Sequence, residues 1–149
     1  MSKHLDQIVW KSIHERPLPK GNPRGLTNYL DLAQLVATGE DWETAWSAFL
    51  HEFMLFRQAS FFQYPPPESF SRGYRAMLAG TAEVLCDEFQ LPVPLWVHEP
   101  QYIMPELWDL YEWMFTGMTD EQNHRRIESS DPLYLKHGVV WRRRDLITL

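Results

Sequence analysis

Residues 70–89, FSRGYRAMLAGTAEVLCDEF, carry the clearest amphipathic pattern in the chain. Mostly apolar side chains recur there at helical spacing, at positions Phe70, Tyr74, Met77, Leu78, Thr81, Leu85 and Phe89. Prolines at 65–67 come before the pattern, and Pro92 and Pro94 follow it, so breakers bound the stretch on both sides. The pattern predicts a long helix with one face in the core and Cys86 as a buried small side chain.

Helical spacing recurs on both sides of this stretch. Residues 42–56 are apolar over more than half of a helix circumference, which predicts a helix at the centre of the fold. Thr119 followed by Gln122 fits a capping box, and Asp131-Pro132 begins a single helical piece that ends before Gly138. We expect helices over residues 3–14, 28–38, 42–56, 70–89, 105–114 and 120–129, and a short strand over 139–142.

Length and composition place this chain among globular proteins. It has 149 residues with 44% hydrophobic and 23% charged side chains, which predicts one all-α helical domain of about six helices over residues 1–149. The single cysteine excludes an internal disulfide and a multi-cysteine zinc site. Neither a long apolar run nor a signal-peptide pattern is present, so we expect a cytoplasmic protein without membrane association.

Charge is distributed unevenly along the sequence. The net charge is −6, and residues 76–124 contain nine Asp or Glu but no Lys or Arg. Such a surface repels phosphate, so nucleic acid is not expected to bind there, whereas a protein partner with a basic surface is favoured. The pattern also fits an acidic face that simply keeps the protein in solution.

Aromatic and acidic residues alternate between positions 96 and 113. Trp and Tyr are common anchors of protein interfaces, and acidic neighbours suit a partner with a basic rim. This segment therefore predicts a partner-binding surface, although the same rings could fill the core. The expected contact residues are Trp96, His98, Glu99, Tyr102, Glu106, Trp108, Asp109, Glu112 and Trp113.

Two other functional classes remain open on the sequence. A hydrolase could use a site built from His51, Glu52 and His98, although His51-Glu52 lacks the second histidine of a zinc-protease helix because position 55 is Leu. A DNA-associated regulator could use the basic cluster Arg142, Arg143 and Arg144, which could equally pair with the protein's own acidic residues. Neither catalytic residues nor a metal site nor a cofactor is predicted.

Two stretches resemble a group of small uncharacterised bacterial proteins. The first is LAGTAEVL at 78–85 with LPVPLW at 91–96, and the second is SDPLYLKHGVVWR at 130–142. The resemblance covers about residues 70–149. Members of this group are similar to partners in toxin–antitoxin-type gene pairs, which implies a neutralising or regulatory subunit. The leading expectation is thus a non-enzymatic, antitoxin-like or regulatory binding subunit, and the resemblance implies a toxin as its partner.

Overall fold

Five α-helices and three 3-10 turns make up the part of the chain that the structure, a computed structural model, describes: residues 26–110 and 117–143. The helices are α2 (Tyr29–Ala37), α3 (Trp42–Phe56), α4 (Arg72–Glu88), α5 (Asp120–Glu128) and α6 (Pro132–Lys136). The turns are η1 (Ala59–Phe62), η2 (Leu95–His98) and η3 (Pro100–Tyr102). The predicted all-α fold is confirmed, and the helix predicted over residues 3–14 lies outside the described residues.

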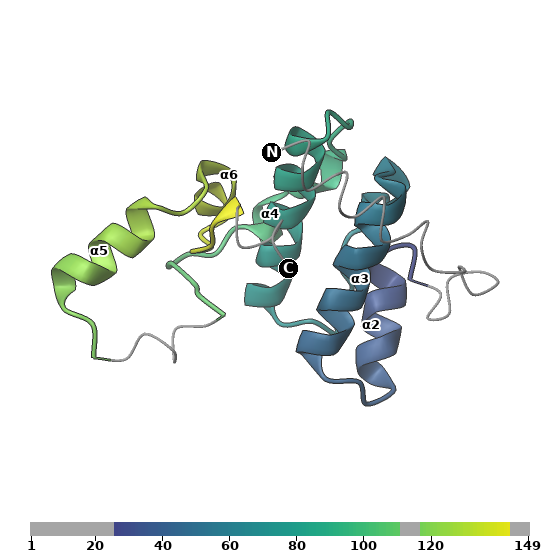
Figure 1. Ribbon diagram of the computed structural model, residues 1–149, viewed down its shortest axis with the longest axis horizontal. Helices are drawn as coiled ribbons and strands as arrows, with labels where there is room; N and C mark the ends of the chain where they lie inside the picture. Colours follow the sequence, from purple (N-terminus) through teal and green to yellow (C-terminus); the bar gives the residue numbers. More distant parts are fainter. Residues whose placement is uncertain (1–25, 111–116, 144–149) are drawn as a thin grey trace.

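Helices α2 and α3 lie side by side and form an antiparallel pair (Figure 1). The predicted caps begin both of them, because the side chain of Asn28 accepts from the Asp31 amide at 3.0 Å and that of Asp41 from the Thr44 amide at 2.9 Å. Gly39, with a φ of +104°, supplies the left-handed turn between them. Rings from both helices then pack together, as in the stacked pair Tyr29 and Phe49.

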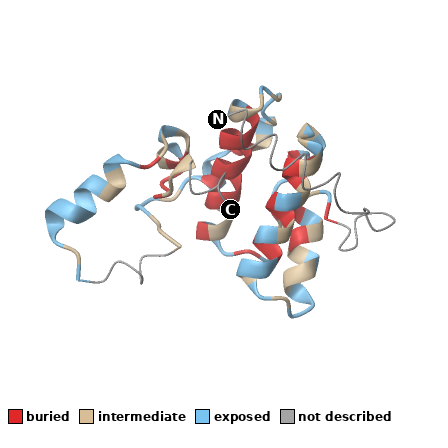
Figure 2. Ribbon diagram, viewed as in Figure 1, coloured by how far each residue is buried: buried red, intermediate tan, exposed pale blue. Residues whose placement is uncertain are grey.

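The most deeply buried helix is α4, rather than α3 as the sequence predicted. Twelve of its residues are buried, and Figure 2 shows a nearly continuous run of buried positions along it. It begins at Arg72, after the Ser71 cap, two residues later than the start predicted at residue 70. The Tyr29 hydroxyl donates to the Leu78 carbonyl at 2.6 Å, and Tyr134 of α6 packs over Gly80, so α2 and α6 both close on α4.

The helix predicted from Pro105 to Met114 is absent from residues 105–110, and residues 111–116 lie outside the described ranges. The amide of Trp108 donates to the Gly138 carbonyl at 2.8 Å, and the Val140 amide donates to the Trp108 carbonyl at 2.9 Å. These bonds use the backbone groups that a helix would need, so this segment is extended. Trp108 and Val139 form an isolated parallel bridge, in place of the short strand predicted over 139–142.

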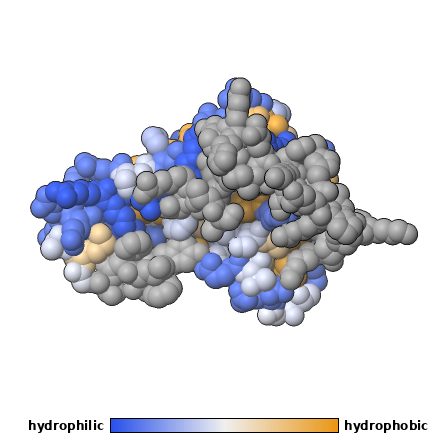
Figure 3. Space-filling model, in the orientation of Figure 1, coloured by the Kyte–Doolittle hydropathy of each residue, from blue (hydrophilic) through white to orange (hydrophobic). Residues whose placement is uncertain are grey.

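The last two helices follow their predicted caps. Thr119 and Gln122 form the capping box of α5, and Asp131 accepts from the Leu133 amide at the start of α6. Helix α5 stands away from the bundle in Figure 1, and the surface over it is hydrophilic in Figure 3. None of the helices among the described residues is long and apolar enough to cross a membrane.

Candidate functional site

The predicted aromatic anchors in the described residues face the core. The half-buried Trp96 donates its indole N–H to the Phe62 carbonyl at 2.8 Å, and its ring contacts Tyr102 with centroids 5.1 Å apart. Tyr102 is only 3% exposed. Because these rings pack inward, they hold the segment in place rather than present themselves to a partner.

Trp108 is also packed against α4. Its ring contacts Tyr74 with centroids 5.5 Å apart and occupies the space that a side chain at Gly73 would fill. A larger residue at position 73 would displace the indole, so Gly73 permits this close approach. The remaining predicted anchor, Trp113, and its neighbour Glu112 lie outside the described residues.

The predicted polar contact residues divide into exposed and engaged groups. Glu99 and Glu106 are exposed, and the Glu99 carboxylate accepts from the side-chain amide of Gln101 at 2.6 Å. Asp109, in contrast, is bound to the guanidinium of Arg126. His98 is half-exposed, and its Nδ1 lies 3.9 Å from Oε1 of Glu83. Only Glu99, Glu106 and His98 are thus presented to solvent in the described part of the predicted set.

Sequence reasoning missed the apolar groups that this segment does expose. Leu95 is 87% exposed and Leu107 55%, and Val93 and Ile103 are also exposed. We call these four residues the aliphatic surface: Val93, Leu95, Ile103 and Leu107. The signal available in the sequence was that Val93, Leu95 and Leu107 stand next to a proline or a tryptophan, since a turn that buries Val97 leaves Leu95 facing outward.

A buried ionic network fixes the segment to α4 and α6. His137 is fully buried, its Nε2 lies 2.7 Å from Oε1 of Glu83, and its Nδ1 lies 2.7 Å from the Tyr102 carbonyl. Lys136 donates to Oε2 of Glu83 at 2.8 Å. The three elements α4, α6 and η3 are thereby joined at one carboxylate.

The hydrogen bonds of this network fix the orientation of the His137 ring. The Tyr102 carbonyl can only accept, so Nδ1 of His137 carries a proton. Nε2 of His137 and Nζ of Lys136 each contact a different oxygen of the Glu83 side chain. The arrangement is therefore a structural link between α4, α6 and η3, and its histidine is closed to solvent.

The hydrolase residues are not assembled into one site by the contacts of the described residues. His98 lies near Glu83, whereas His51 and Glu52 are on α3, and no group of three or more His, Cys, Asp or Glu residues in the described ranges is placed to hold a metal ion. Cys86 is buried as predicted. Burial, with the nearby charge of Glu83, raises the pKa of its thiol to about 11, which disfavours a nucleophilic thiolate.

The basic cluster at the C-terminus pairs internally at Arg143. Its guanidinium donates to Asp131 at 2.9 Å, Asp87 at 2.8 Å and Glu88 at 3.1 Å. Burial alone would lower the pKa of Arg143, but the hydrogen bonds that it donates to Asp87 and Glu88 and the charge of Asp131 outweigh this effect, so the pKa is raised. Arg142 is half-buried, and Arg144 lies outside the described residues.

Comparisons with known proteins give no relative. No protein-family model, no curated protein and no solved structure matches this chain.

Proposed function

We propose that this chain is a non-enzymatic, cytoplasmic protein-binding subunit, and that the aliphatic surface is its contact region. The observation that carries the proposal is the exposure of Leu95, which at 87% is the most exposed of the large hydrophobic residues described. Isolated exposed leucines are common, but this one belongs to a segment of 15 residues (93–107) that holds four of the seven exposed large hydrophobic residues described.

Rigidity supports a binding role for this segment. Val97 is fully buried, Trp96 is tied to the Phe62 carbonyl, and the Tyr102 carbonyl is bound by His137. These inward contacts fix the backbone on both sides of Leu95, so the leucine loses little conformational freedom when a partner covers it. A preorganised apolar anchor of this kind binds more tightly than one on a freely moving loop.

The acidic charge of this segment indicates a partner with a basic surface. The exposed Glu99 and Glu106 lie among the aliphatic residues in the sequence, and residues 76–110 contain no Lys or Arg. One guanidinium reaches this segment, that of Arg72, which donates to the Ile103 carbonyl at 3.0 Å. A protein with an apolar pocket and a basic rim complements this surface, as expected of a toxin or enzyme that an antitoxin-like or regulatory subunit neutralises.

The test combines site-specific cross-linking with substitution in the native cell. A benzophenone side chain at position 95 should form an adduct with one protein that has a basic surface, whereas the same group at Leu30 on α2, which is also exposed, should not. Leu95→Asp should weaken retention of that protein at least about tenfold, and Leu30→Asp should leave it unchanged.

Three outcomes would overturn the proposal. Retention that survives Leu95→Asp, or that falls equally with Leu30→Asp, would separate binding from the aliphatic surface. Absence of any position-95 adduct would do the same. A purified chain that is dimeric by light scattering, and monomeric as Leu95→Asp, would show that a second copy of the chain covers the surface instead.

A further inference from the structure

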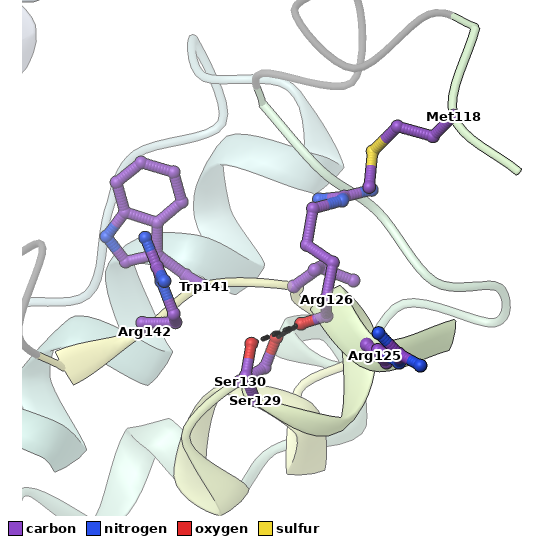
Figure 4. Close-up of a pocket in the computed structure, with 8 residues that line it drawn as sticks. Met118, Arg125, Arg126, Ser129, Ser130, Trp141 and Arg142 are labelled. Carbon is purple, nitrogen blue, oxygen red and sulfur yellow. Dashed lines mark hydrogen bonds between the residues drawn. The ribbon is translucent and has the colours of Figure 1, made fainter. Parts of the chain in front are cut away.

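A pocket of about 350 Å³ lies between α5, the turn into α6 and the segment that follows α6. In Figure 4, Trp141 and Arg142 line one side, Met118 and Arg126 line the other, and Ser129 and Ser130 form the base. This volume is within the usual range of small-molecule sites. Neither Asp nor Glu is among the described residues that line it.

Three arginines give the pocket its cationic groups. Arg125 is 72% exposed and paired with Glu121, an arrangement that contributes little energy in water and that an incoming anion can replace. Arg126 is held by Asp109 and by the side chain of Asn123, so its position is fixed before any ligand arrives. Guanidinium groups are well suited to phosphate and carboxylate because they donate two parallel hydrogen bonds.

The two serines of the pocket provide hydrogen-bond acceptors, whereas the arginines provide donors. Both hydroxyls donate to the Arg126 carbonyl, Ser129 at 2.8 Å and Ser130 at 3.4 Å, and Figure 4 marks these bonds. Since their hydrogens are directed at that carbonyl, the hydroxyl oxygens offer lone pairs. A ligand that fits must therefore carry hydroxyl or amino donors as well as an anionic group.

The rest of the lining is apolar and includes one flat ring. Val140 is buried, and Met118 and Trp141 are half-buried. An indole face favours a planar aromatic partner, which binds through stacking and the exclusion of water. The pocket thus combines guanidinium donors, hydroxyl acceptors and an aromatic wall within the volume of a small organic molecule.

We propose that this pocket binds a small organic anion that carries a planar ring and hydroxyl groups, with the chemistry of a nucleoside monophosphate. The phosphate would lie toward the arginines, the ring against Trp141 and the sugar hydroxyls toward Ser129 and Ser130. None of the four residues of the aliphatic surface lines the pocket, so the pocket variants test this proposal independently of the protein-binding role.

Titration calorimetry on the full chain tests the proposal, with AMP, adenosine, inorganic phosphate and benzoate as separate probes. AMP should bind with a Kd below about 1 mM, and at least about tenfold more tightly than adenosine or phosphate alone. Benzoate binding as tightly as AMP would contradict the role of the serine hydroxyls and overturn the proposal, because benzoate carries no hydroxyl or amino donor. Absence of binding by all four probes would overturn the proposal.

Matched variants separate the pocket from general charge effects. Arg142→Gln should weaken AMP binding about tenfold. Arg72→Gln removes the same charge on the exposed start of α4 and should change the affinity less than twofold. Arg125→Gln, at an exposed position, repeats the test if Arg142→Gln does not fold, and it should weaken binding severalfold. Equal losses in the Arg72 and pocket variants would contradict a specific site.

Discussion

Helix α4 buries twelve of its 17 residues, whereas α5 buries none of its nine. Both begin with a side-chain cap, so the difference lies beyond their first turns. The contacts of α4 are with other elements, through Tyr29, Tyr134 and the network at Glu83. Helix α5 has its capping box and the exposed i,i+4 pairs Glu121–Arg125 and His124–Glu128, and its tertiary tie is the ion pair of Arg126 with Asp109. Tertiary packing thus stabilises α4, whereas α5 depends mainly on local interactions.

The largest expected effect comes from the buried carboxylate of α4. Glu83→Gln removes the carboxylate that Lys136 and the fully buried His137 share, and it puts a neutral amide in its place. The free energy of unfolding should fall by about 3–5 kcal/mol, as measured by urea denaturation. Glu128→Gln on α5, which removes an exposed carboxylate paired with His124, should change it by less than about 0.5 kcal/mol. Similar losses in both variants would contradict the distinction between the helices.

The second effect is a pH dependence at Cys86. Its pKa is raised to about 11 in the folded protein, while the unfolded thiol titrates near its ordinary value of about 8.5. The unfolded state loses the proton first, so this contribution is complete below about pH 8.5 and is lost as pH rises toward 11. The loss is about 3 kcal/mol, and it should appear as the difference between wild type and Cys86→Ala in urea denaturation across that range. Parallel pH profiles for the two proteins would refute the shift.

A smaller loss is expected where α4 meets α6. A Cβ at Gly80 would lie 2.7 Å from a ring atom of Tyr134, and that ring is fully buried, with its hydroxyl 2.6 Å from Thr81. Gly80→Ala should therefore destabilise the fold by about 1–3 kcal/mol, although alanine favours helix. Thermal and urea denaturation both measure this change. A gain in stability would show that the ring yields and that helix propensity decides.

The same contrast explains what the sequence could predict. Caps and helical spacing depend on neighbouring residues, and Asn28, Asp41, Thr119 and Asp131 all begin helices as expected. The direction of a side chain in a turn depends on contacts distant in sequence. Trp96 faces inward because of Phe62, and Trp108 because of Gly73 and the 138–140 backbone. The spacing of apolar residues along the sequence carries no information about these contacts. Leu95, rather than the tryptophans, is therefore the exposed group.

The smallest expected effect on the global free energy of unfolding is that of removing the N-terminal cap of α5. Thr119→Ala removes the side chain that accepts from the Gln122 amide at 3.1 Å, a loss of about 1 kcal/mol to the helix itself. Because α5 buries no residue, its unfolding need not disturb α4, and the global free energy of unfolding should change by less than about 0.5 kcal/mol. Amide hydrogen exchange should accelerate about fivefold in α5 and remain unchanged in α4.

The equivalent Ser71→Ala on α4 is the matched control, since loss of that cap should lower global stability by about 1 kcal/mol. If Thr119→Ala lowers the global stability as much as Ser71→Ala does, the two helices unfold together, and α5 is tied to the core more strongly than its exposure implies.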